Sequence, residues 1–229
     1  MKKYLTHSVN KALKERKEYY LYDVPVYILK PLPEHININN IINDLTNMIP
    51  FEFLYGLEGI YVGEFEELQD RRIQAMLKDG AIYLSSFKDH PEVTETIIVN
   101  DIIHELAHLL EERSYAGVYG DDIIEKEYIS KKKKVVELLR ANGISFYGMG
   151  DLFFSEDRTN DLDAFLFNEL GYDNLSILTT GLFTSPYSVT SIREYFANGF
   201  EEFINGDESY LKEISPALYN KLDSMLEIE

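Results

Sequence analysis

The sequence predicts an α+β fold, in which an N-terminal α/β lobe with a small mixed sheet precedes a long helix and a helical C-terminal lobe. Three observations lead to this prediction. Short segments rich in β-branched and aromatic residues alternate with helix-like segments before residue 95. A run without Pro or Gly then covers residues 95–112. After Gly120, segments typical of strands nearly vanish.

The chain has 229 residues, of which 45% are hydrophobic, and this is enough to bury one substantial core. We therefore expect a single domain over residues 1–229. Within it, residues 1–20 are expected to form a polar, helical lead-in. Residues 21–112 should form the α/β lobe with the long helix, and residues 113–229 the helical lobe.

The expected elements follow in chain order. In the first lobe they are strand 24–29, helix 38–48, strand 59–63, helix 66–77 and strand 81–85. In the second lobe the expected helices are 123–140, 159–170, 192–204 and 216–225. The strand at 81–86 has two interpretations. It lies at a sheet edge and binds an extended peptide through added main-chain hydrogen bonds, or it is an interior strand that pairs only with its neighbours.

The formal net charge of −18 excludes several classes of partner. Such a chain repels nucleic-acid backbones and anionic membrane surfaces, so we expect neither nucleic acid nor membrane as a partner. The one basic cluster, residues 131–134, lies in a segment rich in Glu and Lys and is interpreted as a solvated helix face. There is no Cys, so neither disulfides nor thiolate metal ligands are available.

The N-terminal residues Met1, Lys2 and Lys3 begin like a signal peptide, but no apolar segment follows them. No segment approaches the 18 apolar residues that are typical of a membrane-spanning helix. As written, the sequence therefore indicates a cytoplasmic protein. Secretion stays open if a leader was removed or if export is non-standard.

The strongest functional signal is the motif His104-Glu105-Leu106-Ala107-His108, which reads H-E-x-x-H. On a helix, residues four apart share a face, so both imidazoles can reach one metal ion. The carboxylate of Glu105 then lies beside a metal-bound water, whose proton it can accept. This pattern is typical of zinc peptidases.

The residues around the motif favour a helix with two distinct faces. Thr94 offers an N-cap just before the run. The polar side carries both histidines together with Glu105. The opposite side is apolar and consists of Ile98, Val99, Ile102, Ile103, Leu106, Leu109 and Leu110. Two ordinary histidines on a surface helix would fit this pattern, but that alternative does not explain the glutamate between them.

A catalytic zinc ion usually has three protein ligands and one water. The metzincin continuation is excluded, because it requires Gly in place of Glu111 and His in place of Ser114. The remaining histidines have no spacing that points to the metal and are interpreted as surface residues; they are His7, His35 and His90. The third ligand should therefore be a carboxylate from the helical lobe.

The best candidate is Glu194, which stands seven residues after Tyr187 and opens the sequence Glu194-Tyr195-Phe196-Ala197. With the H-E-x-x-H motif, this segment resembles the peptidase domain of the anthrax lethal factor family of zinc metallopeptidases, which also contains the Pro-Pro endopeptidases. The segments 59–65 and 80–84 are similar to the family as well, so that the likeness covers roughly residues 24–205. It implies a zincin-like fold built around the active-site helix.

The resemblance also implies a role for each residue. His104, His108 and Glu194 would bind Zn²⁺, Glu105 would activate the water, and Tyr187 would stabilise the oxyanion. The family commonly has an acidic residue four positions after the ligand glutamate, where it supports a zinc histidine. Here that position is Asn198, whose amide supplies less charge.

Two of these residues have structural alternatives. Ser191 and Glu194 fit a capping box, in which the glutamate bonds back to the N-cap amide, and Glu201 is then the reserve ligand. Tyr187 follows Pro186 in a loop and could be a hydrophobic plug. The acidic segment 156–163 lacks the spacing of an EF-hand, and no calcium site is predicted there.

The sequence thus predicts a zinc-dependent endopeptidase that binds a peptide or protein substrate in extended form. A proline near the scissile bond is expected from the resemblance alone. Two alternatives stay open: a catalytically inactive zincin-fold domain that binds a partner, and a toxin effector peptidase delivered to another cell. The second shares the chemistry and differs in biology.

Overall fold

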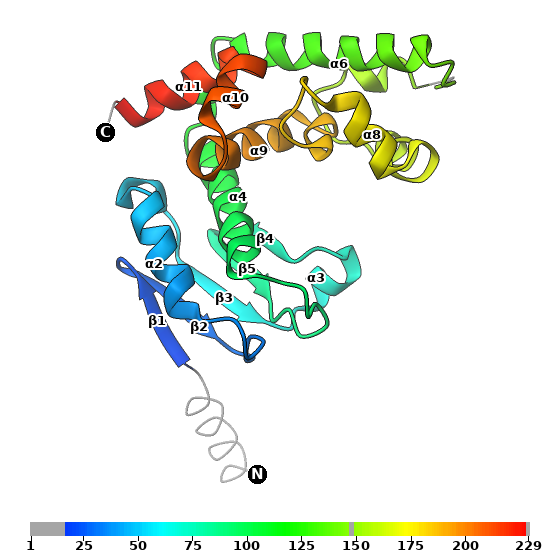
Figure 1. Ribbon diagram of the computed structural model, residues 1–229. Coiled ribbons are helices and arrows are strands. Elements are labelled where there is room, and N and C mark those ends of the chain that lie inside the picture. Colours follow the sequence, from blue (N-terminus) through cyan, green and yellow to red (C-terminus); the bar gives the residue numbers. More distant parts are fainter. Residues whose placement is uncertain (1–16, 147–148, 228–229) are drawn as a thin grey trace. The chain divides into compact units, whose positions relative to one another are not determined.

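The computed structural model describes residues 17–146 and 149–227, and it confirms a mixed α+β architecture (Figure 1). The chain forms two compact units, one ending at Leu109 and the other beginning at Leu110. The division falls within a single helix, α4 (Glu95–Arg113).

The first unit contains a five-stranded mixed sheet with the order β1-β2-β3-β5-β4 (Figure 1). Its strands are β1 (Lys17–Leu21), β2 (Val24–Ile28), β3 (Gly59–Gly63), β4 (Ala75–Lys78) and β5 (Ala81–Ser85). The three central strands β2, β3 and β5 run parallel, while β1 and β4 are antiparallel to their neighbours. The sheet therefore ends in an antiparallel strand on each side.

The alternation of residues in the strands decides which face of the sheet is buried. In β2, Val24, Val26 and Ile28 are buried and the residues between them are partly exposed. The buried face of the sheet shares one apolar core with α2 (Ile38–Met48) and α4. The residues that line this core include Val26, Ile60, Val62, Leu84, Ile41, Leu45, Ile98 and Ile102.

The opposite face carries a row of tyrosines at matching register positions of the three parallel strands. Tyr27 lies opposite Tyr61, which lies opposite Tyr83. Their ring centroids are 5.1 and 5.4 Å apart, a spacing at which aromatic rings attract one another across strands. The row ties the parallel strands together on the face that does not pack against α2 and α4.

Two predictions for the first unit are wrong, and one alternative that the sequence left open is decided. The helix expected over 66–77 ends early: α3 spans Glu66–Arg71, and β4 follows it. Residues 17–20, expected in a helical lead-in, belong to β1, and residues 1–16 lie outside the described residues. Of the two interpretations of the strand at 81–86, the interior one is confirmed, because β5 pairs with β3 on one side and β4 on the other.

Among its described residues, the second unit contains helices and loops but no strand. It contains the last residues of α4, followed by α5 (Tyr115–Tyr119), α6 (Ile123–Ala141), α7 (Asn160–Ala164), the π-helical segment η3 (Phe165–Leu170), α8 (Tyr172–Thr179), α9 (Ile192–Asn205), α10 (Glu208–Ile214) and α11 (Pro216–Glu227). Short 3-10 segments are η2 (Leu152–Phe154) and η4 (Pro186–Val189) here and η1 (Phe51–Leu54) in the first unit.

Two buried tyrosines hold α6 against the segments around α9. The rings of Tyr128 on α6 and Tyr195 on α9 stack 5.4 Å apart. The Tyr128 hydroxyl donates to the carbonyl oxygen of Val189 at 2.9 Å. One turn further along the same side of α9, Gly199 allows a close approach, because a Cβ there would lie 2.2 Å from a side-chain carbon of Leu218 on α11. Small and large residues thus interlock around α9.

The basic cluster 131–134 is not the solvated helix face that its composition predicts. Lys131 and Lys132 are 4% and 0% exposed, whereas Lys133 and Lys134 are exposed. Lys131 Nζ donates to the carbonyl oxygen of Ile214 at 2.6 Å and to Ser215 Oγ at 2.7 Å. The prediction is therefore wrong for the first two lysines, which hydrogen-bond inside the helical unit.

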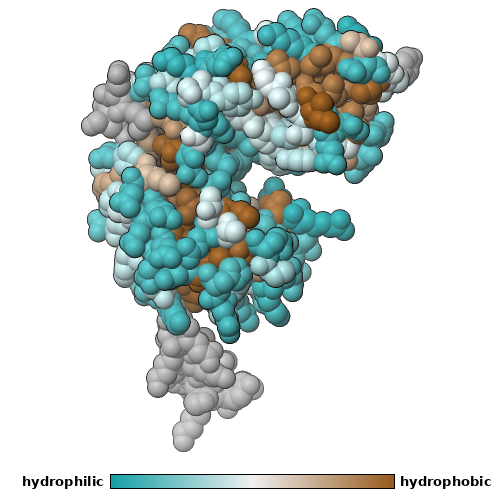
Figure 2. All heavy atoms as spheres, in the orientation of Figure 1, coloured by the Kyte–Doolittle hydropathy of each residue, from teal (hydrophilic) through white to brown (hydrophobic). Residues whose placement is uncertain are grey.

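The outer surface is rich in polar side chains. Hydrophilic residues cover most of the face shown in Figure 2. Among the described residues, no helix combines the length and the apolar character required to cross a bilayer.

Candidate metal centre

Helix α4 carries both histidines of the motif, and its start confirms the predicted cap. Thr94 Oγ1 accepts a hydrogen bond from the backbone N–H of Ile97 at 3.3 Å. The helix then continues without interruption to Arg113. One turn apart, His104 and His108 are half-buried, with ring centroids 5.0 Å apart and ring planes at 85°. The two rings therefore emerge side by side from one helix face.

Glu105, between the histidines, is only 9% exposed. Its Oε2 accepts the backbone N–H of Leu77 at 2.6 Å. Leu77 belongs to β4, the last strand in the sheet order, and lies opposite Ile82 of β5. In an antiparallel pair every second residue directs its N–H away from the partner strand. The carboxylate of Glu105 thus lies against the open edge of the sheet.

Glu194 occupies the first turn of α9. Ser191 is the N-cap, and its Oγ accepts the N–H of Glu194 at 3.2 Å. The helix buries Tyr195 and Phe196, the two residues that follow. This amphipathic start leaves the half-buried Glu194 on a less buried face of the helix. The Ser191 half of the alternative capping box is therefore present.

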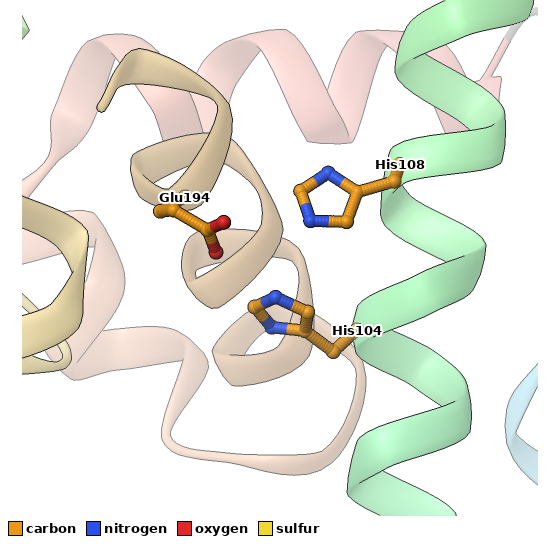
Figure 3. A group of neighbouring side chains, drawn as sticks. All are labelled: His104, His108 and Glu194. Carbon is orange, nitrogen blue, oxygen red and sulfur yellow. The ribbon is translucent and has the colours of Figure 1, made fainter. Parts of the chain in front are cut away.

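His104, His108 and Glu194 offer three ligand atoms that lie within 4.8 Å of one another (Figure 3). All three side chains are half-buried, and in the figure they point toward a common centre from α4 and α9. Two imidazoles with one carboxylate form a donor set that zinc and other divalent metal ions accept.

The same three residues are those selected from the sequence, and Glu201, the reserve ligand, is not in the group. His35 is exposed, and its Nε2 contacts the carbonyl oxygen of Val93 at 2.8 Å. His90 is half-buried, and its Nε2 lies 2.9 Å from Gln74 Nε2. His7 lies outside the described residues.

Tyr187 lies in η4 and is fixed through its backbone. Its N–H donates to Ser185 Oγ at 3.2 Å, and its carbonyl oxygen accepts from Thr190 Oγ1 at 2.8 Å. Burial raises the pKa of the Tyr187 hydroxyl, and the charge of Glu194 raises it further. The phenol is thus neutral at ordinary pH and able to donate a hydrogen bond.

Arg158 and Asp163 accompany Tyr187 and were not predicted as site residues. Arg158 Nη1 donates to the Tyr187 hydroxyl oxygen at 2.6 Å, and its Nε donates to Asp163 Oδ2 at 2.5 Å. The guanidinium carbon also lies 5.3 Å from the centre of the Tyr187 ring. No spacing in the sequence indicates this group, because Arg158 precedes Tyr187 by 29 residues.

A second arginine ties the start of α9 to the end of α4. Arg193, next to Glu194, donates from Nε to Glu111 Oε2 at 2.9 Å and from Nη2 to Glu112 Oε1 at 3.0 Å. Glu111 is 1% exposed and also accepts the Tyr119 hydroxyl at 2.6 Å. Burial and the charge of Glu111 raise the pKa of that tyrosine. Within the second unit, these contacts join the first turn of α9 to the last turn of α4.

Asn198 replaces the acidic residue that the resemblance leads one to expect. Its Nδ2 donates to the backbone carbonyl oxygen of Glu194 at 2.7 Å. The amide group thus bonds to the backbone of the candidate ligand Glu194, within the first turns of α9. An aspartate could not make this contact, because an ionised carboxylate has no N–H to donate.

No family model, curated protein or solved structure matches this chain.

Proposed function

We propose that the protein is a zinc-dependent endopeptidase with a zincin-like fold. One observation carries the proposal: two imidazoles from an H-E-x-x-H helix and the carboxylate of Glu194 converge within 4.8 Å. Glu105 stands between the two histidines in the sequence, as the chemistry requires of a general base. The seven-residue spacing of Tyr187 and Glu194, shared with the lethal factor family, supports the same reading.

The roles follow from the chemistry of each side chain. Zinc held by His104, His108 and Glu194 would supply a Lewis acid and lower the pKa of a bound water. Glu105 would take the proton of the attacking water and deliver it to the leaving amine. Tyr187 would donate its hydroxyl proton as a hydrogen bond to the carbonyl oxygen, on which negative charge develops.

The substrate class is a peptide in extended conformation. The edge strand β4, rather than the interior strand β5, offers main-chain groups for an added strand. The Leu77 N–H at this edge already meets Glu105, so a peptide bound along β4 would lie beside the proposed base. A preference for proline near the scissile bond is expected only from the family resemblance.

The test is a peptide-library cleavage assay of the zinc-loaded protein, with and without a chelator. Wild type should cleave, and the chelator should abolish cleavage. Glu105→Gln should retain stoichiometric zinc and lose activity by about 10²–10⁴-fold, because the amide cannot accept the proton. Glu137→Gln is the matched control, since Glu137 is an exposed residue of α6.

Normal cleavage by Glu105→Gln would contradict the proposal. Stoichiometric zinc without cleavage of any library peptide would instead favour a catalytically inactive binding domain. Elemental analysis after purification also decides the metal, since imidazole and carboxylate ligands bind other divalent ions as well.

A further inference from the structure

We propose that Arg158 is a positioning residue for Tyr187: it binds the phenol oxygen and thereby directs the hydroxyl proton toward the carbonyl of the substrate. Asp163 in turn holds the guanidinium. The proposal rests on the proposed peptidase function. It concerns residues of the second unit only.

The direction of the hydrogen bond carries the argument. An arginine side chain has five N–H donors and no acceptor, so Arg158 Nη1 must donate and the Tyr187 oxygen must accept. The single proton of the phenol cannot point toward Nη1, because Nη1 is itself a donor. The hydroxyl proton is therefore available for another acceptor. A role in stabilising an oxyanion requires a proton that is free in this way.

The guanidinium is held in two further ways. Its Nε donates to Asp163 Oδ2 at 2.5 Å, and its central carbon lies 5.3 Å from the centre of the Tyr187 ring. Asp163 is 17% exposed and sits in α7, whose N-cap Thr159 accepts the N–H of Leu162 at 3.3 Å. Arg158 is thus fixed although 43% of its side chain is exposed.

Charge provides a reason why the hydroxyl needs to be held. Burial and then the negative charge of Glu194 raise the pKa of Tyr187, while the positive charge of Arg158 opposes them. Without Arg158, the rotating hydroxyl would be free to donate to any nearby carboxylate. A hydroxyl that donates to a carboxylate is not available to the reacting carbonyl. Arg158 would thereby affect the chemical step more than substrate binding.

A double-mutant cycle tests the proposal on the zinc-loaded protein. Arg158→Met should lower kcat by about 10–100-fold with little change in KM, and Tyr187→Phe by about 100-fold or more. In the Tyr187→Phe background, Arg158→Met should have almost no further effect, because its target is gone. Arg140→Met is the control, since Arg140 also stacks on an aromatic ring, Phe146, in another part of the unit.

Equal losses from Arg158→Met in both backgrounds, or an unchanged kcat, would overturn the proposal. Zinc content and circular dichroism show whether each variant is folded. If Arg158→Met fails to fold, Arg158→Lys provides a second variant. It keeps the positive charge but loses the planar guanidinium with its several N–H donors, so it should also lower kcat.

A second readout does not depend on activity. In protein labelled with ¹³Cζ-tyrosine, the signal that disappears in Tyr187→Phe should shift in Arg158→Met and stay in place in Arg140→Met. An unmoved signal would overturn the contact itself. If the wild-type protein cleaves no peptide, the proposed function fails, whereas this measurement still decides whether Arg158 holds Tyr187.

Discussion

At the scale of single residues, the two buried lysines of α6 show most clearly how a charge is accommodated inside this protein. Lys132 is 0% exposed, and its Nζ donates to the carbonyl oxygen of Ser155 at 2.8 Å and lies 5.1 Å from the centre of the Tyr128 ring. Burial lowers the pKa of Lys132, and likewise of Lys131, to about 8. Both groups therefore lose their protons in a range where an exposed lysine keeps its own.

This shift predicts a pH dependence of stability. Lys132 has a lower pKa in the folded chain, about 8, than the usual 10.5 of the unfolded chain. The contribution of Lys132 to stability is fully present above its pKa in the unfolded chain. It is lost as the pH falls through its pKa in the folded chain. From pH 7 to 9.5, the free energy of unfolding of wild type should gain about 2 kcal/mol relative to Lys132→Met.

Urea unfolding of both proteins at several pH values measures this difference directly. Raised tyrosine pKa values act equally on both proteins and cancel in the comparison. A constant difference between pH 7 and 9.5 would mean that Lys132 keeps its proton over this range.

Residues with a role at the candidate site differ in how far the sequence reveals them. His104, Glu105 and His108 are adjacent on one helix, so a local pattern suffices to select them. Glu194 needed a likeness to a family, because nothing in its own turn distinguishes a ligand from a capping glutamate. Arg158 was not predicted, since its contact with Tyr187 arises only when distant segments pack together.

At the scale of elements, one carboxylate organises the start of the last helix. Glu127 on α6 accepts the N–H of Ala217 at 2.9 Å and the N–H of Leu218 at 3.1 Å, both in the first turn of α11. It also accepts the hydroxyl of Tyr195 from α9 at 2.7 Å. A negative charge at a helix N-terminus satisfies free N–H groups and favours the helix dipole. Glu127 thus joins three helices.

Removing this carboxylate should be costly. Glu127→Ala should lower the free energy of unfolding by about 2–3 kcal/mol, because three hydrogen bonds to a charged acceptor are lost together. Glu137→Ala, an exposed change on the same helix, should stay within about 0.5 kcal/mol of wild type. Denaturant unfolding measures both variants. Similar values for the two would show that α11 does not depend on this contact.

Strand β4 shows why an element can be missed from sequence. Ala75, Met76 and Leu77 are all residues that favour helices, so the predicted helix extends through them to residue 77. In the structure Arg72 adopts a left-handed conformation with φ 55°, which ends α3. The four residues of β4 then pair with β5. Pairing with a strand formed later in the chain outweighs local propensity here, and no local window contains that information.

At the scale of the whole molecule, the α+β class is predictable from the sequence because the hydrophobic periodicity that indicates it is repeated over many residues. A single short element has too few residues for this signal, and contacts between side chains that are distant in the sequence leave no periodic pattern. The three proposed zinc ligands stand on α4 and α9, which are far apart in the sequence. A metal ion that binds the folded chain but not the unfolded chain stabilises the folded state.

Zinc should therefore raise the thermal midpoint of unfolding. At a free zinc concentration 100-fold above Kd, the gain is about 2.7 kcal/mol, or about 5–10 °C for a chain of this size. His104→Ala should abolish the rise. The chain has no Cys, so thiolates of the unfolded state do not compete for the metal. Calorimetry with zinc and with chelator provides the test, and identical midpoints would argue against a metal site.

The bond between Leu77 and Glu105 has one more consequence, which concerns self-association. An open sheet edge presents unpaired N–H groups and is a template on which other chains can add strands and aggregate. The buried carboxylate occupies one of these N–H groups, and the neighbouring Lys78 adds a charge. The residue proposed to act as the base therefore also removes one hydrogen bond from any strand that adds to this edge. This disfavours long continuous pairing with other chains, while the remaining main-chain groups of β4 stay available to a short peptide.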